Sequence, residues 1–119
     1  MSMDNKEFGK KLEERTRKFA LSIIKLSIQL PNNLEAKVIK YQMTKAGTSV
    51  GANYREANRA RSKADFKNKI KICESEASET AYWLEIIIEL KWIKDDIIQP
   101  IFSESNELLA IFTSIGKNS

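Results

Sequence analysis

The residues best suited to do chemistry in this chain are arginines and lysines near its middle. Cations of this kind neutralise phosphate groups when they gather on one surface, so their spacing predicts a site for the backbone of RNA or DNA. The candidate cations are Lys45, Arg55, Arg59, Arg61, Lys63, Lys67, Lys69 and Lys71. Tyr54 and Phe66 lie in the same segment. We expect contacts with phosphates, and the segment shows no base-reading motif.

The net charge of +4 conceals an uneven distribution along the chain. Residues 37–71 carry a local charge of +8, whereas residues 72–119 carry a local charge of −6. Two interpretations stay open. The basic segment binds nucleic acid, or it is a solvated surface that pairs with acids of neighbouring helices, of an acidic protein or of another subunit. Steeply salt-dependent binding of nucleic acid favours the first, and burial of the arginines between subunits favours the second.

A group of acids, Glu74, Glu76 and Glu79, invites comparison with the metal sites of helical bundles. Those sites combine glutamates with Glu-x-x-His motifs, and this chain contains no histidine. We therefore expect neither a metal nor another cofactor. We predict instead that Glu76 or Glu79 neutralises Lys45 or Arg55 between adjacent helices.

The composition argues against an enzyme. Without histidine, the chain lacks the usual general base and the usual proton shuttle at neutral pH. It also shows no phosphate-binding glycine loop or activated nucleophile, so no small-molecule substrate is expected. Cys73 has no disulfide partner in the chain, which indicates a reduced, cytoplasmic environment. No stretch approaches the roughly 20 apolar residues of a membrane span, so no membrane partner is expected.

Apolar residues at helical spacing predict the elements that position these side chains. They favour one all-α domain over residues 1–119, with helices at about residues 6–30, 33–61, 63–91 and 97–115. Short connections between them indicate an antiparallel up-down-up-down four-helix bundle. The cations around the second connection should therefore converge on one tip. The expected helix-end signals are Asn32 with Glu35, Ser62 with Asp65, Asp96 with Gln99, Pro100 in a first turn, and Gly116 as the last stop.

The second predicted helix carries two glycines, Gly47 and Gly51, on its packing face. Each costs about 1 kcal/mol relative to alanine in a helix interior, so a requirement other than helix propensity keeps them there. We predict that they let a neighbouring helix approach closely. Ser49 and Asn53 would then supply hydrogen bonds inside the chain or between subunits, because burial without partners would cost about 1–3 kcal/mol each.

The same part of the chain resembles a known protein family. The runs that carry the resemblance are K-A-G-T-S-V-G-A-N-Y-R-E-A, S-K-A-D-F-K-N-K and E-A-S-E-T-A-Y-W-L-E. They are similar to those of the bacterial 23S rRNA intervening-sequence proteins and of the related accessory variability determinants of diversity-generating retroelements. The similarity covers nearly the whole chain.

The family pattern is a basic residue, then Ser-Val, Asn and Glu, at the spacing of Lys45, Ser49, Val50, Asn53 and Glu56. This chain has Lys45 where Arg is frequent and Tyr54 where Ile is frequent, and Lys lacks the bidentate geometry of Arg. The resemblance implies a four-helix bundle, in several members a homopentameric ring, with a basic surface proposed to meet nucleic acid. The implied partners are further copies of the chain, as a pentamer, and RNA or DNA.

Overall fold

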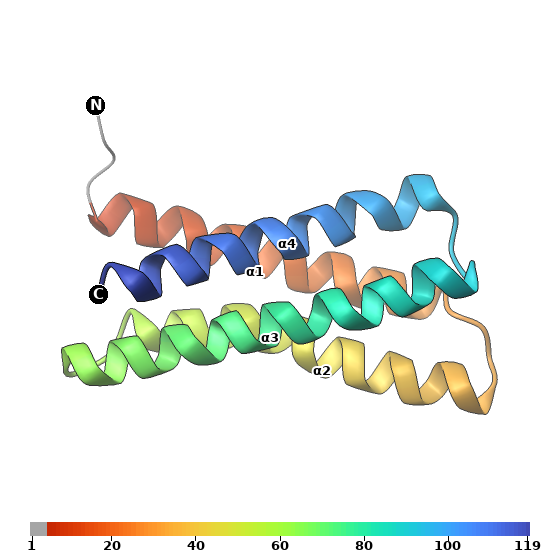
Figure 1. Cartoon of the computed structure of the whole chain (residues 1–119), viewed down its shortest axis with the longest axis horizontal. Helices are drawn as coiled ribbons and strands as arrows, with labels where there is room; N and C mark the ends of the chain where they lie inside the picture. Colours follow the sequence, from red (N-terminus) through yellow and green to blue (C-terminus); the bar gives the residue numbers. More distant parts are fainter. Residues whose placement is uncertain (1–4) are drawn as a thin grey trace.

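The structure, a computed structural model, describes residues 5–119. Its helices are α1 (Asn5–Ile28), α2 (Leu34–Ala57), α3 (Lys63–Leu90) and α4 (Asp95–Lys117). Successive helices run in opposite directions, in a bundle with extents of 44 × 28 × 20 Å (Figure 1). The predicted all-α four-helix bundle is confirmed.

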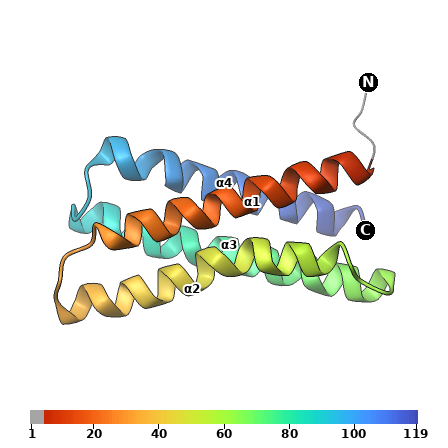
Figure 2. The same cartoon turned by 180° about the vertical axis from the view of Figure 1, so that it is seen from behind.

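Each helix packs against the next one in the chain, but α1 and α4 are in contact over a shorter stretch than the other neighbouring pairs. Both views show these two helices crossing (Figures 1 and 2). The α2–α3 connection lies at the same end of the bundle as the start of α1 and the end of α4 (Figure 1). We call this the basic end, because it carries most of the predicted cations. The distal end carries the α1–α2 and α3–α4 connections.

The core is built from apolar residues that recur at helical spacing along each helix. In α1 these are the buried residues Leu12, Phe19, Ile23 and Leu26, and Leu30 follows just beyond the helix. Their partners from the other helices include Met43, Val50, Ile70, Cys73, Leu84, Leu108 and Phe112. Tyr54 was expected near the basic surface, but it is 2% exposed and its ring lies 5.5 Å from that of Phe112.

The two glycines of α2 face α1. A Cβ on Gly47 would lie 2.8 Å from a side-chain carbon of Ile23, and a Cβ on Gly51 would lie 2.9 Å from the hydroxyl of Thr16. Both separations are shorter than a Cβ atom tolerates, so only glycine allows this approach. The predicted close contact therefore exists, and the neighbour is α1 of the same chain.

Ser49 and Asn53 make their hydrogen bonds within α2. The Ser49 hydroxyl donates to the Lys45 carbonyl at 2.6 Å, and the Asn53 amide donates to the Ser49 carbonyl at 2.8 Å. Both bonds run from residue i to residue i−4, which is a common way for a helix to satisfy its own polar side chains. These two side chains are thus satisfied inside the chain.

The ends of α2 and α3 differ partly from the prediction. Asn33, not Asn32, caps α2, because its side-chain oxygen accepts from the Ala36 N–H at 2.8 Å. Ser62 caps α3 as predicted, with its hydroxyl accepting from the Asp65 N–H at 3.0 Å. The largest difference is at the end of α2, which stops at Ala57 and not near residue 61. The N–H groups of Arg59 and Ala60 donate to carbonyls three residues earlier, not four, so the α-helical pattern ends there.

The last helix is longer than predicted at both ends. It begins at Asp95 after Lys94, which makes no side-chain cap bond, so the expected cap at Asp96 with Gln99 is wrong. Pro100 consequently lies inside the helix and not in its first turn, and residue 100 cannot donate to the Asp96 carbonyl. Gly116 does not end the helix, which continues to Lys117.

Candidate nucleic-acid interface

The structure brings seven of the eight predicted cations to the basic end or the helical turns beside it. Arg55 lies in the last turn of α2, and Arg59 and Arg61 lie in the connection that follows. The other four belong to the first turns of α3: Lys63, Lys67, Lys69 and Lys71. Because α2 ends at Ala57, the two connection arginines sit on the loop at the tip and not on a helix face.

Lys45 does not join this group. It precedes Ala57 by twelve residues, a distance of roughly 18 Å along the helix axis at about 1.5 Å per residue. Its ammonium lies 6.0 Å from the centre of the Tyr41 ring, in a cation–π contact. It lines a separate pocket on α2 with Lys37 and Lys40. Lys45 therefore belongs to a different surface.

The candidate cations are not neutralised inside the chain. Within residues 5–119, the ion pairs shorter than 4.0 Å join Lys11 to Glu7, Lys18 to Glu14, and Arg15 to Glu104 and Glu107. None of them involves a predicted phosphate-binding residue. All eight candidates except the half-buried Lys69 are exposed. The positive charge at the basic end thus faces solvent without a carboxylate partner among the described residues.

Cations from the two terminal helices extend the same surface, and the sequence reasoning missed them. Lys10 and Arg17 of α1 line a groove of about 460 Å3 with Arg55 of α2. Glu13 and Glu14 also line it, so this groove holds mixed charge. The up-down-up-down order could have pointed to α1, since it brings the start of the chain to the α2–α3 connection.

A second extension lies between α3 and α4. Lys117 shares a pocket of about 330 Å3 with Lys67 and Lys71. The carboxylate in this pocket, Glu74, accepts a hydrogen bond of 2.5 Å from the Thr113 hydroxyl. Lys117 was outside the prediction because it is isolated in an acidic part of the sequence. Only the return of α4 to the basic end brings it beside the lysines of α3.

The predicted ion pairs of Glu76 and Glu79 with Lys45 or Arg55 are absent within residues 5–119. Glu79 instead accepts from the indole N–H of Trp83 at 3.1 Å, within α3. Burial, and then the negative charge of Glu79, raise the pKa of Glu76, while Ser49 and Lys45 act in the opposite direction. Glu76 therefore faces α2 without a close ionic contact.

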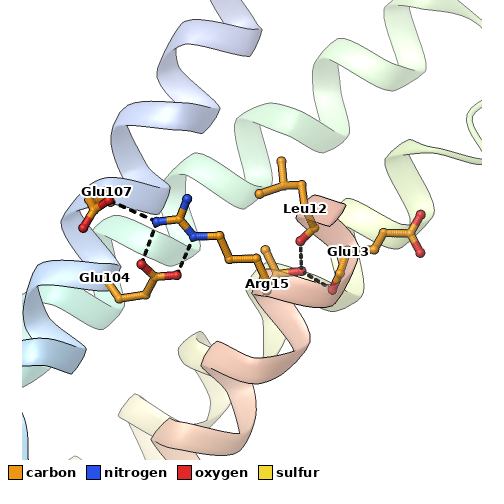
Figure 3. Close-up of polar contacts among 6 residues, drawn as sticks. Leu12, Glu13, Arg15, Glu104 and Glu107 are labelled. Carbon is orange, nitrogen blue, oxygen red and sulfur yellow. Dashed lines mark hydrogen bonds and ion pairs between the residues drawn. The ribbon is translucent and has the colours of Figure 1, made fainter. Parts of the chain in front are cut away.

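The strong ion pair of the structure joins the helices that pack least extensively. Arg15 of α1 donates two hydrogen bonds of 2.7 Å to the carboxylate of Glu104 in α4, and a third of 3.1 Å to Glu107 (Figure 3). The hydrogen bonds to Glu104 raise the pKa of Arg15 above its ordinary value. This bidentate contact stabilises the packing of α1 against α4. It thereby helps to fix the relative positions of the two terminal helices.

Residues 5–119 contain neither a reactive cysteine nor a metal-binding cluster. Cys73 is buried, and burial raises the pKa of its thiol to about 12, so the nucleophilic thiolate is scarce at neutral pH. No three His, Cys, Asp or Glu side chains of residues 5–119 are grouped so that they could hold a metal ion. No helix within residues 5–119 is both long enough and apolar enough to cross a membrane.

The distal end carries a different surface, which the sequence reasoning did not single out. Two stripes of exposed apolar side chains follow helical spacing there: Leu21, Ile24 and Ile28 on α1, and Leu34, Val38 and Tyr41 on α2. Ile28 and Leu34 are 74% and 73% exposed. Apolar groups of this size are seldom left in water without a partner. The stripes mark a surface that differs in kind from the basic end.

The charges near the distal end are also divided between two sides. Lysines accompany the apolar stripes of α1 and α2: Lys25, Lys37, Lys40 and Lys45. The α3–α4 side carries four acids, Glu85, Glu89, Asp95 and Asp96, against two lysines, Lys91 and Lys94. The exposed apolar residues on the acidic side are Tyr82, Leu90 and Ile97. The two sides are therefore complementary in charge, and both expose apolar groups.

Comparison with known proteins identifies the family. The sequence profile of the 23S rRNA-intervening sequence proteins matches residues 10–114. The chain belongs to this family. No curated protein sequence matches the chain. The matched region includes the whole of α2 and α3 and most of α1 and α4.

A solved structure is similar to this family member over most of its length. It is a protein of unknown function from the S23 ribosomal protein family of Bacteroides thetaiotaomicron, with 39% sequence identity and a TM-score of 0.81. The alignment covers 88% of the present chain and 97% of that chain. The likeness extends to the fold and to the sequence, and that protein's function is itself unknown.

The residues of the family pattern serve mainly the bundle itself. Val50 is fully buried, and its carbonyl accepts a 3.5 Å hydrogen bond from the Cys73 thiol. Ser49 and Asn53 bond within α2, as described above. Glu56 is exposed beside Arg55 in the last turn of the helix. In this family member, the pattern therefore describes the α2 scaffold that leads to the basic end.

Proposed function

We propose that this protein is a non-catalytic nucleic-acid-binding protein that acts as a homo-oligomer. The observation that carries the proposal is the group of exposed cations at the basic end, which have no carboxylate partner within residues 5–119. In a protein that used these charges only for internal ion pairs, acids of neighbouring helices would lie within 4.0 Å of them, whereas Glu13 and Glu14 line the groove beside Arg55 without an ion pair to it. Unpaired cations on a rigid end suit phosphate groups.

The proposed contacts come from three elements. Arg59 and Arg61 project from the connection at the tip, and the lysines of α3 continue the surface along one side. Lys117 adds a cation from α4. Contacts of this kind read the phosphate backbone and not base sequence, so the affinity should fall steeply as salt increases.

Assembly with further copies of the chain is the second part of the proposal. It is supported by the exposed apolar stripes of α1 and α2 and by the opposite charges on the two sides of the distal end. The α1–α2 side of one copy would pack against the α3–α4 side of the next, with lysines facing acids. A repeated contact of two different surfaces forms a ring when the rotation between copies closes, and by family resemblance we propose a ring of five copies. Basic ends on one side of such a ring would bind multivalently.

The experiment is a salt series with a labelled structured RNA and a DNA duplex of equal length. The test variant is Arg59→Glu with Arg61→Glu, and the matched control is Lys91→Glu with Lys94→Glu, which changes net charge equally on the acidic α3–α4 side of the distal end. We expect affinity that falls steeply with salt, is lost in the test variant and is largely kept in the control. Absence of binding at low salt, or equal loss in both variants, would overturn the nucleic-acid proposal.

A protein-interaction scaffold is the second candidate, and the apolar stripes of the distal end favour it. In that case the basic end binds an acidic protein or a neighbouring subunit instead of nucleic acid. Light scattering of the purified chain with and without nucleic acid separates the candidates. A stable oligomer without affinity for any nucleic acid would favour the scaffold.

A further inference from the structure

The tip of the basic end holds a pocket whose lining combines an aromatic ring with cations. Its volume is about 450 Å3, within the range of about 300–1,000 Å3 typical of small-ligand sites. The side chains that matter here are Arg61, Ser62, Lys63, Phe66 and Asn118. They come from the α2–α3 connection, the start of α3 and the residue after α4, so only the folded bundle assembles them.

The aromatic ring distinguishes this pocket from an ordinary charged surface. Phe66 is partly buried, because it packs against the hydrophobic core, and the same residue lines the pocket. A ring held in this way loses little freedom when a flat ligand stacks on it. Aromatic rings beside cations are the usual platform for bases of single-stranded nucleic acids.

The polar groups of the pocket are suited to the rest of a nucleotide. Arg61 and Lys63 are exposed and make no ion pair within residues 5–119. The Ser62 hydroxyl oxygen accepts from the Asp65 N–H, which leaves its O–H group free to donate. The Asn118 side chain offers both a donor and an acceptor, as the edge of a base requires. Ser119 also lines the pocket, and no Asp or Glu side chain is part of its lining.

We propose that this pocket takes the base of an unpaired nucleotide, stacked on Phe66, while Arg61 and Lys63 bind the adjacent phosphates. The inference rests on the proposed function and adds the class of ligand, which is RNA or DNA with bases outside a duplex. Bases inside a duplex are already stacked and paired, so they cannot enter the pocket without being extruded. The protein should therefore prefer single strands or loops to a fully paired duplex.

The test compares a single-stranded RNA, the DNA strand of the same sequence and a fully paired duplex of the same length, each carrying 2-aminopurine. The variants are Phe66→Leu, which keeps apolar volume but removes the ring, and Phe66→Tyr, which keeps the ring. Phe8→Leu is the matched control, because Phe8 is 41% exposed near the start of α1. Thermal melting of each variant checks that the bundle is intact.

We expect wild type to bind single strands more tightly than the duplex and to change the 2-aminopurine fluorescence. Phe66→Leu should lower the affinity for single strands about tenfold and leave duplex affinity unchanged. Phe66→Tyr should retain wild-type binding, and Phe8→Leu should have no effect. The two single-strand arms distinguish RNA from DNA.

Two results would overturn the pocket while leaving the proposed function in place. One is salt-dependent duplex binding with no preference for single strands. The other is a Phe66→Leu variant that melts normally and binds every nucleic acid like wild type. Failure of the wild-type protein to bind any of the three at low salt would instead remove the proposed function itself.

Discussion

The basic end and the distal end of this bundle expose different side chains on the same four helices. At the basic end the exposed groups are mainly cations without carboxylate partners within residues 5–119. At the distal end, apolar side chains lie between lysines on the α1–α2 side and acids on the α3–α4 side. Like charges repel one another, so the basic end is poorly suited to contact a second basic end. The distal end offers apolar area and complementary charge.

This difference suits the two regions to the two proposed tasks. Apolar stripes stabilise contacts with another folded chain, because burial of apolar area is the main favourable term in association. Unpaired cations stabilise contacts with phosphates, because they release counterions from the nucleic acid. The shaft between the ends, where α1 meets α2 through glycines, keeps both surfaces on one rigid body.

The largest effect should follow from neutralising the basic end. Arg55→Gln with Lys63→Gln and Lys67→Gln removes three cations, which should reduce the slope of log affinity against log salt by about 2 to 3. At moderate salt we expect RNA affinity to fall more than tenfold, with no change of oligomeric state. Anisotropy titrations and light scattering measure the two quantities. Dissociation of the oligomer without loss of RNA affinity would reverse the assignment of the two ends.

The next effect concerns the distal end. Ile28→Glu with Leu34→Glu places two charges on its most exposed apolar side chains. We expect the oligomer to dissociate into folded monomers, because charged groups cannot be buried unpaired at a contact. Phe8→Glu is the control at the basic end, and sedimentation velocity gives the masses. An unchanged oligomer would show that these stripes do not form the contact.

Both ends of the bundle depend on the close contact between α1 and α2 in the shaft. A Cβ on Gly51 would meet buried Thr16 at 2.9 Å, whereas a Cβ on Gly9 would find its nearest neighbour, Asn58, at 3.4 Å. Gly51→Ala should therefore lower the free energy of unfolding by about 1–2 kcal/mol. This figure is a net effect, in which the gain in helix propensity offsets part of the cost of overpacking. Gly9→Ala should leave it unchanged or raise it by up to about 1 kcal/mol. Chemical denaturation followed by circular dichroism distinguishes the two variants.

The smallest effect is a pH dependence at Glu76. Burial raises its pKa in the folded protein, so the folded state holds this proton more tightly than the unfolded state. Its contribution to stability is present at low pH and is lost as pH rises through the folded pKa. Glu76→Gln should match wild type below about pH 4 and be more stable at neutral pH, while exposed Glu85→Gln serves as control. Equal pH profiles for Glu76→Gln and wild type would contradict this assignment.

Much of the scaffold could be predicted from the sequence. The apolar positions on the packing face of α1, among them Leu12, Phe19 and Ile23, are buried, and Ser62 caps α3 as its spacing indicated. Local signals were less reliable where two neighbouring residues were chemically equivalent, as with Asn32 and Asn33. Asp96 failed as a cap because α4 begins one residue earlier, at Asp95.

The candidate site was predictable where it is local in sequence. Arg59, Arg61 and Lys63 are near one another in any helical hairpin, so composition alone found them. Lys117 could not be found in that way, because its partners Lys67 and Lys71 are distant in the chain. Lys45 was grouped with the others by proximity in sequence, although a helix carries it far along the bundle axis.

Sequence motifs identify the family, and helical periodicity with short connections predicts the four helices and their order, because few arrangements bury the apolar faces. The sequence also shows that the cations are concentrated around one connection. Three features could be seen only in the folded bundle: Gly47 and Gly51 face α1, Tyr54 is buried while Phe66 lines a pocket, and α4 brings Lys117 to the basic end. The reason is physical: periodicity is a property of one helix, whereas the contact between two helices depends on their relative rotation, spacing and crossing.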